Sequence, residues 1–304
     1  MTLHLSEAEI AALIEPADAV EIIEGAFRRL AAGQVHSQTR VRLPMNGGHL
    51  ALMGATDREL GYSGIKTYSA TAAQAVFVVV LFDNESGDCV GVLQAGTLGQ
   101  LRTGAASGVA AKYLAREGAS TLGIIGCGFQ AETQVACIRA AVPTIDRVVA
   151  YCRSADRLAA FCRHVGAEPA EAHPEAVQGA DVVVTATTSK DPVVRGEWLD
   201  PGALVCAIGA NDPSRRELDN VVLERAAFVC CDSRENAQLE SADLIEPVAS
   251  GVLDWLEVHE LQAVVAGEIA GRQSDDDIVV FKSNGLAAWD IAAAAAVVAK
   301  LETR

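Results

Sequence analysis

The chain has 304 residues, of which half are hydrophobic, and a formal net charge of −16. This length accommodates two modest domains or one large one, and the negative charge disfavours nucleic acid or an anionic membrane surface as a partner. The longest strongly apolar run, Ala75 to Phe82, is too short to span a bilayer. We therefore expect no membrane segment, and no targeting peptide is recognisable.

The eight cysteines show no C-x-x-C spacing, and the six histidines are scattered along the chain. Most of the cysteines fall in apolar stretches, where a free thiol behaves as a small hydrophobic group. The sequence therefore predicts no metal site, and it favours a reducing, cytoplasmic compartment.

Two helices and then a β-rich stretch are expected in the first part of the chain. Ser6 and Glu9 form a capping box, and Pro16 opens a second helix with an apolar stripe that ends at Gly33. Alternating or apolar runs then predict strands, and a helical pattern closes the region. The expected strands are 40–44, 49–53, 63–68, 76–82 and 90–93, and the helix is 98–116.

From residue 120 the pattern alternates between strand and helix, which is typical of a parallel sheet. We predict an α/β protein with a Rossmann-type, doubly wound NAD(P)-binding domain at 117–284 and a mixed α+β domain at 1–116, to which the family resemblance described below assigns substrate binding and dimerisation. A C-terminal helix at 285–304 is expected to return to the first domain. The expected strands are 122–125, 147–151, 182–185, 204–208, 228–231 and 279–282, and the expected helices are 129–141, 155–165 and part of 173–178.

A glycine-rich turn follows the first of these strands, with the form G-x-G-x-x-A. Gly126 permits the tight turn, Gly128 lets a diphosphate approach the backbone, and Ala131 allows close packing of the helix on the strand. Phe129 and Gln130 lie within the turn, where free N–H groups and the helix dipole favour phosphate. We predict a dinucleotide site here, against the alternative of a plain strand-to-helix turn.

The residues after the second strand bear on the choice of nucleotide. NAD-selective sites place a carboxylate there to accept from the ribose 2′-hydroxyl, but this chain has Arg153, Ser154 and Arg157. An arginine suits a 2′-phosphate, although a solvent-exposed arginine at a helix start is the competing reading. NADP(H) is favoured, with NAD(H) as the alternative. Threonines after the next strand could contact the cofactor or cap the loop: Thr185, Thr187 and Thr188.

Three cations of the first domain stand in unusual settings. Arg40 begins Arg-Val-Arg-Leu-Pro, Lys66 lies inside an alternating strand, and Arg102 lies on a helix of small residues. Most lysines and arginines are solvated, with only their stems covered, and taken singly these three fit that reading. The small residues around Arg102 indicate that something approaches closely there.

These motifs make the chain resemble the ornithine cyclodeaminase/mu-crystallin family over nearly its whole length. The resemblance is carried by Arg40–Pro44, the Lys66 strand, Leu101–Ser107, the Gly126 turn, Ile208–Asp219, Cys231–Glu235 and Lys282–Gly285. It implies a homodimer joined through the non-nucleotide domains, with the active site between the two domains. It also implies that Arg40, Lys66 and Arg102 hold the substrate's α-carboxylate near the nicotinamide, and that Ser283 is among the cofactor-binding residues.

One departure from the family pattern bears on the reaction. Cyclodeaminases have an Asp after Ile-Gly-Ala, where this chain has Asn211, followed by Asp212. Asn cannot take up a proton, so we predict an NAD(P)H-dependent reductase of an α-imino acid or cyclic ketimine carboxylate such as Δ1-pyrroline-2-carboxylate. Residues expected to line the active site are Arg42, His49, Thr103, Asn211, Asp212 and Gly285.

Three other functions remain open. The first is redox-neutral cyclodeamination of ornithine or lysine with bound NAD, in which Asp212 replaces the missing Asp. The second is an alanine-type dehydrogenase, and the third is a mu-crystallin-like ligand-binding protein. The group that protonates the imine nitrogen is also open between Lys66, a water molecule and the substrate's own iminium.

Overall fold

The computed structural model describes residues 2–302, which form two compact units. Unit 1 comprises the described residues up to Thr103 and from Gly285 onward, and unit 2 comprises Gly104–Asn284. Within the described residues, no helix combines the length and apolarity that crossing a bilayer requires.

The division falls inside a helix, between Thr103 and Gly104, rather than after residue 116, where the sequence analysis drew it. The second half of this helix packs within unit 2. A Cβ added to Gly104 would lie 2.3 Å from the carbonyl oxygen of Thr133, and Arg272 Nε donates to the Leu114 carbonyl at 2.8 Å. Close backbone approach and this hydrogen bond tie residues 104–114 to unit 2.

Unit 1 is a seven-stranded sheet of order β1-β7-β6-β5-β4-β2, in which β3 also pairs with β4. All pairs are antiparallel except β1–β7. The strands are β1 (Leu3–Leu5), β2 (Val35–Ser37), β3 (Val41–Met45), β4 (Gly48–Asp57), β5 (Tyr62–Thr71), β6 (Ala75–Asp83) and β7 (Cys89–Gln94). The helices are α1 (Glu7–Ala11), α2 (Pro16–Ala31), the first part of α3 (Gly96–Leu114), and α11 (Ala287–Glu302).

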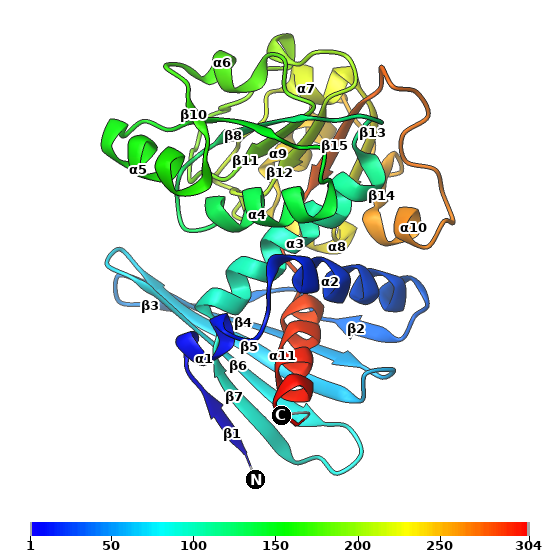
Figure 1. Ribbon diagram of the computed structural model, residues 1–304. Helices are drawn as coiled ribbons and strands as arrows, with labels where there is room; N and C mark the ends of the chain where they lie inside the picture. The colour runs from blue at the N-terminus through cyan, green and yellow to red at the C-terminus, as the bar shows by residue number, and fades with distance from the viewer. Residues whose placement is uncertain (1, 303–304) are drawn as a thin grey trace. The chain divides into compact units, whose positions relative to one another are not determined.

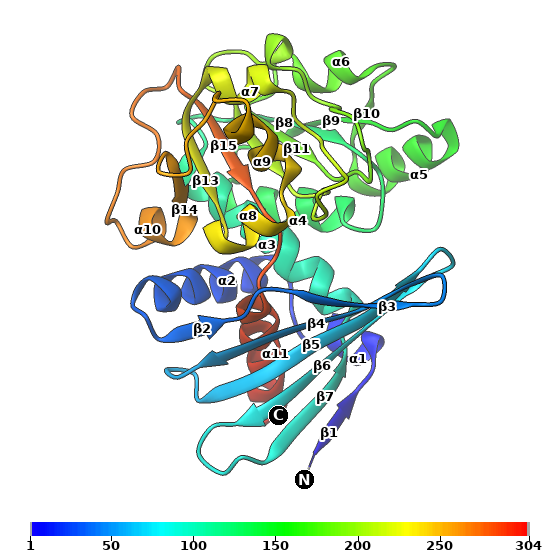
Figure 2. The ribbon, with the colours of Figure 1, turned by 180° about the vertical axis from the view of Figure 1, so that it is seen from behind.

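Helix α11 lies across β4, β5 and β6, and α2 packs against α11 and β2 (Figure 1). Gly64 of β5 permits this closeness, since a Cβ there would lie 2.6 Å from Cδ1 of Ile291 in α11. The other face of the sheet is turned toward the viewer in Figure 2, where α11 passes behind the strands. One face of this sheet therefore forms the core of unit 1.

Unit 2 is an eight-stranded, all-parallel sheet of order β10-β9-β8-β11-β12-β15-β13-β14. The strands are β8 (Thr121–Ile125), β9 (Arg147–Tyr151), β10 (Glu168–Pro169), β11 (Val182–Thr185), β12 (Leu204–Ala207), β13 (Ala226–Cys231), β14 (Val258–Glu260) and β15 (Ile278–Lys282). Its further helices are α4 (Ala131–Ala141), α5 (Ala155–Val165), α6 (His173–Val177), the 3₁₀ helix η1 (Gly196–Trp198), α7 (Asn220–Arg225), α8 (Arg234–Glu240), α9 (Ala242–Ala249) and α10 (Leu261–Val265).

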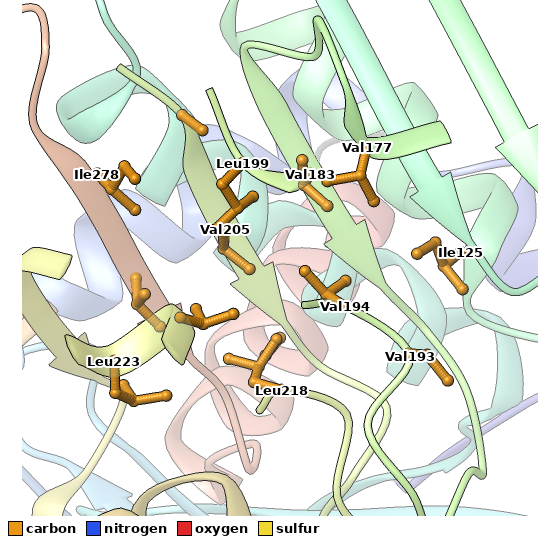
Figure 3. Packing of buried hydrophobic residues seen from close by; sticks show 14 of the residues in the cluster. Ile125, Val177, Val183, Val193, Val194, Leu199, Val205, Leu218, Leu223 and Ile278 are labelled. Atoms are coloured by element: carbon orange, nitrogen blue, oxygen red, sulfur yellow. The ribbon is translucent and has the colours of Figure 1, made fainter. Parts of the chain in front are cut away.

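This arrangement confirms the predicted Rossmann-type fold, with its order reversal between β8 and β11. The central strands are buried along their length, as expected for a parallel sheet covered on both faces. Figure 3 shows part of this core, in which Val183, Val205 and Ile278 from the sheet pack with Leu218 and Leu223.

The predicted strands of unit 2 agree with the structure to within two residues at each end. The sequence analysis did not anticipate the elements α7–α10, η1, β10 and β14. It also did not predict that β15, the last strand in the chain, inserts between β12 and β13.

Candidate substrate and cofactor sites

Lys66 lies on the buried face of β5, and only 2% of its surface is exposed. Strand alternation turns it inward, because its neighbours across the sheet are the buried Met53 and Val79. Its Nζ lies 2.7 Å from Oδ1 of Asp290 in α11 and 5.5 Å from the centre of the Phe77 ring. Lys66 is therefore a desolvated cation rather than a solvated surface lysine.

Burial, followed by the positive charge of Arg102, lowers the pKa of Lys66 to about 8, while Asp290 opposes this decrease. Arg40, just before β3, is close enough for its charge to lower the same pKa. Lys66 can thus change its charge near physiological pH, which an ordinary lysine does not do.

Arg102 lies on α3 and is also buried, with 7% of its surface exposed. Its Nε is 3.1 Å from the same Oδ1 of Asp290, and its guanidinium carbon is 5.8 Å from the centre of the Trp289 ring. Two glycines leave room for the cations. A Cβ at Gly285 would lie 2.8 Å from a terminal nitrogen of Arg102, and one at Gly99 would lie 3.2 Å from Nζ of Lys66.

Two of the three predicted carboxylate-binding cations therefore meet at one buried carboxylate, which the sequence analysis did not identify. Asp290 is completely buried and belongs to a helix of mainly Ala and Val. An acidic residue inside an otherwise apolar helix was the available signal, since such a charge is buried only when it is paired. Lys66, Arg102 and Asp290 together carry one positive charge in excess when all three are ionised.

Arg42 and His49 lie on the same face of the sheet as Lys66. Arg42 pairs across the strands with the buried Ala51, and His49 precedes Ala51 by two residues, so both share its orientation. The His49 ring lies 5.9 Å from the Tyr68 ring, and the Tyr68 ring lies 5.1 Å from Phe77. A row of half-buried rings thus leads from Lys66 to His49.

The glycine turn of unit 2 could hold a diphosphate. Gly126 has φ +107°, and a Cβ there would lie 2.4 Å from the Ala186 carbonyl oxygen. Gly128 has no atom within 4 Å of its Cβ position, and Ala131 is completely buried at the start of the eleven-residue helix α4. Gln130 makes no side-chain cap for this helix, so the first-turn N–H groups fit a phosphate as their partner.

Exposed basic residues follow the second strand of the nucleotide-binding fold. Arg153 and Arg157 are both exposed, and Ser154 caps α5 by accepting from the Arg157 N–H at 3.4 Å. Burial and then the charge of Arg153 lower the pKa of His173, whose ring lies 4.3 Å from that of Tyr151 at the end of β9. The nearest following carboxylate is Asp156, within the first turn of α5.

A buried charge network fixes the loops that follow β11 and β12. Glu217 accepts from the N–H and the hydroxyl of Thr187, both at 2.8 Å, and from the N–H groups of Gly209 and Ala210. Lys282 donates to the Ala210 carbonyl at 2.5 Å and lies 3.0 Å from Asp243. Ala210 is thereby held at both its N–H and its carbonyl, which fixes the start of the segment that carries Asn211.

The remaining predicted residues have these positions. Thr103 donates its hydroxyl to the Gly99 carbonyl at 2.7 Å. Asp212 accepts from the backbone and hydroxyl of Ser214, and Ser283 donates to Asp232 at 2.9 Å. Thr185 is buried and Thr188 is exposed. Among residues 2–302, no group of three or more His, Cys, Asp or Glu side chains could hold a metal ion.

The chain is similar over most of its length to two enzymes of known activity. The alanine dehydrogenase of Archaeoglobus fulgidus is 36% identical over 304 residues, which cover 96% of this chain and 93% of the relative. The Δ1-pyrroline-2-carboxylate reductase of Bacillus cereus is 38% identical over 221 residues, which cover 70% of this chain and 67% of the relative.

Two solved structures superpose closely. The Δ1-pyrroline-2-carboxylate reductase of Thermococcus litoralis, in complex with NADH and L-proline, has a TM-score of 0.94 and 29% identity, covering 99% of this chain and 98% of its own. An archaeal alanine dehydrogenase dimer with bound NAD has a TM-score of 0.92 and 34% identity, covering 99% and 96%.

The profile of the ornithine cyclodeaminase/mu-crystallin family matches residues 1–304. Both relatives exceed 30% identity, and the two structures share the whole fold. The chain therefore belongs to the ornithine cyclodeaminase/mu-crystallin family.

Proposed function

We propose that this protein is an NAD(P)H-dependent reductase of an α-imino acid or cyclic ketimine carboxylate, such as Δ1-pyrroline-2-carboxylate, giving the L-amino or imino acid. The observation that carries the proposal is the buried meeting of Lys66 and Arg102 at one carboxylate oxygen. The excess positive charge of this cluster, on a protein with a net charge of −16, is suited to a carboxylate ligand.

The broader class follows from family membership: the protein is an NAD(P)-dependent oxidoreductase that acts on CH–NH or C=N bonds. When bound, the nicotinamide supplies the hydride chemistry. In our proposal Arg40, Lys66 and Arg102 bind the carboxylate and orient the imine carbon. Orientation of this kind makes the transfer effectively intramolecular.

Reduction is favoured over cyclodeamination by the residue at position 211. Asn211 cannot take up a proton, whereas cyclodeaminases of the family have an Asp at this point. Asp212, the nearest replacement, already accepts two hydrogen bonds from Ser214. These contacts support a loop in which the carboxylate of Asp212 caps a turn.

A comparison of substrates tests the proposal. NADPH or NADH is mixed with Δ1-pyrroline-2-carboxylate, with Δ1-piperideine-2-carboxylate, or with pyruvate and ammonia, and oxidation is followed by nicotinamide absorbance. We expect the cyclic imines to have the highest kcat/KM. Preference for pyruvate and ammonia would favour the alanine-type dehydrogenase. Ammonia and proline formed from ornithine with catalytic NAD, without net NADH, would favour the cyclodeaminase. Binding without turnover of any substrate would favour a ligand-binding protein.

We also propose NADP(H) as the preferred cofactor, with NAD(H) as the alternative. Support comes from the exposed Arg153 and Arg157 after β9 and from the absence, among the described residues 152–155, of a carboxylate that could accept from a ribose 2′-hydroxyl. The two solved relatives contain NADH and NAD, so kcat/KM must be compared for both cofactors. Arg153→Ala should lower kcat/KM for NADPH by about 10- to 100-fold and leave that for NADH nearly unchanged. Equal losses with both cofactors would contradict the assignment.

The outer face of the unit 1 sheet supports a homodimer, as the family resemblance implied. Its exposed apolar residues lie on neighbouring strands opposite the Lys66 face, and include Val41, Leu43, Ile65, Val76 and Phe82, each at least 36% exposed. An apolar patch of this kind marks an interaction surface, and we propose that a second copy of the chain occupies it. The related archaeal alanine dehydrogenase is a dimer.

Light scattering on two matched variants tests this interface. Ile65→Glu places a charge on the apolar face and should shift the protein toward monomer. Leu256→Glu places the same charge at another exposed apolar residue, 80% exposed in unit 2, and should leave the mass unchanged. A dimer that persists in Ile65→Glu at low protein concentration would locate the interface elsewhere.

A reducing compartment such as the cytoplasm is our proposed location. The structure has eight free cysteines, of which five are buried. Free thiols packed as small hydrophobic groups are typical of such a compartment. Measurement of free thiols in protein freshly isolated from its native cells would test this, since stable disulfides would contradict it.

A further inference from the structure

Asp290 is the one acidic side chain that the structure shows bonded to both Lys66 and Arg102. A single oxygen, Oδ1, accepts from Nζ of Lys66 at 2.7 Å and from Nε of Arg102 at 3.1 Å. The second oxygen, Oδ2, is buried and has no hydrogen-bond partner among residues 2–302. The charge of Asp290 is therefore directed at these two cations.

We propose that Asp290 is a positioning residue of the substrate site, which holds Lys66 and Arg102 side by side and charged so that a substrate carboxylate completes the cluster. This inference rests on the proposed function. It assigns a role to a residue that contacts the two substrate-binding cations rather than the substrate.

The need for such a residue follows from the repulsion between the two cations. Both are buried, and the charge of Arg102 is among the causes that lower the pKa of Lys66. Two desolvated positive charges would either separate or lose a proton unless an anion lay between them. Asp290 is that anion, and its Oδ1 accepts from Nε of Arg102 as well as from Nζ of Lys66.

The groups that face Lys66 come from four different elements. Lys66 faces Arg102 from α3, Asp290 from α11, Arg40 from the segment before β3, and the Phe77 ring from β6. Of these groups only Asp290 is negative. Removing its charge should therefore make Lys66 lose its proton at a lower pH.

The principal test compares the wild-type enzyme with Asp290→Asn, which keeps an oxygen acceptor and a similar size. We expect Asp290→Asn to weaken binding of pyrrole-2-carboxylate, a planar carboxylate probe, by about 10- to 100-fold. The pKa of Lys66, followed by NMR of labelled lysine and assigned with Lys66→Met, should fall below its wild-type value of about 8. Asp290→Glu, which restores the charge, should recover part of both properties.

Asp18→Asn is the matched control, because Asp18 also pairs with a lysine of α11. The Asp18–Lys300 pair measures 2.5 Å, and its two side chains are about two-fifths exposed. If Asp290 only docked α11 on the sheet, Asp290→Asn would resemble Asp18→Asn, with a lower melting temperature but an unchanged Lys66 titration and unchanged probe binding. That result would overturn the inference.

If Asp290→Asn does not fold, the inference is tested by comparing the wild type with Arg102→Gln. With Arg102 neutralised and Asp290 retained, Lys66 should titrate above its wild-type pKa, and an unchanged or lower value would overturn the inference. A failure of this inference can be distinguished from a failure of the proposed function. Absence of imine turnover by the wild type would refute the reductase, whereas the Lys66 titration and probe binding would still report on Asp290.

Discussion

Arg102→Ala is the substitution that most directly tests the carboxylate clamp. The change removes a buried guanidinium that pairs with Asp290 and, in our proposal, with the substrate. A hydrogen bond between charged groups contributes about 2–3 kcal/mol, which corresponds to a loss of about 30- to 150-fold in kcat/KM. Because the carboxylate is bound in both the ground state and the transition state, we expect most of the loss in KM.

The assay is steady-state reduction of Δ1-pyrroline-2-carboxylate with NADPH, alongside a measurement of NADPH binding by fluorescence. Arg28→Ala provides the control, since Arg28 lies in the same unit, is 59% exposed, and pairs with Glu24 one helical turn away. That pair contributes only about 0.3–0.5 kcal/mol, so its loss should not affect the kinetics. If Arg102→Ala were folded, bound NADPH normally, and kept kcat/KM within a few-fold of the wild type, the clamp would be refuted.

Three further predictions concern titration, stability and the nucleotide turn. Substrate binding should weaken as pH rises through about 8, the pKa of Lys66. Burial lowers this pKa from 10.5, so the free energy of unfolding should instead increase between pH 8 and 10.5, where the unfolded chain binds more protons than the folded one. Inhibitor binding and urea unfolding measured across this range would reveal whether the two trends diverge. Lys282→Met leaves the buried Asp243 without its lysine partner. The free energy of unfolding, measured by urea denaturation, should fall by about 3–5 kcal/mol. A loss below about 1 kcal/mol would contradict the pairing. Gly126→Ala puts a Cβ 2.4 Å from the Ala186 carbonyl oxygen at φ +107° and should abolish nicotinamide nucleotide binding in calorimetry, so that unchanged affinity would show that the turn does not hold the diphosphate.

Local patterns were sufficient to predict most of unit 2. The strands β8, β9, β11 and β12 are short apolar runs, and β8 and β9 are followed by helical periodicity, so each pattern is contained within a few residues. The insertion of β15 between β12 and β13 depends on pairing between segments far apart in the chain, which no local pattern records. The short helices α7–α10 were missed because elements of five to eight residues carry too few turns to establish a period.

In the candidate substrate site, too, local patterns gave some features, whereas contacts between distant parts of the chain could not be predicted. Strand alternation separated Lys66 from Ile65 and Thr67 but did not show which face is buried, and Lys66 taken singly fitted a solvated lysine; the structure buries it. The small residues around Arg102 indicated a close approach. The partner of both cations could not be located, because Asp290 is 224 residues from Lys66 and 188 from Arg102 along the chain. A charge in an apolar helix indicates that a buried partner exists. Only the packing of α11 on the sheet shows that the partners of Asp290 are Lys66 and Arg102.

Side chains of strand β5 contribute to a different site on each face of the unit 1 sheet. Lys66 points toward α11, while its neighbour Ile65 is 40% exposed on the opposite face, next to Val80 of β6. Because side chains alternate along a strand, a shift of one residue in the pairing of β5 would bury Ile65 at the cation cluster and expose Lys66 on the proposed dimer face. The register of β5 between Met53 and Val79 is therefore a single structural condition for both the carboxylate site and the interface. A substitution on the outer face that preserves this register should change assembly without changing the Lys66–Asp290 contact.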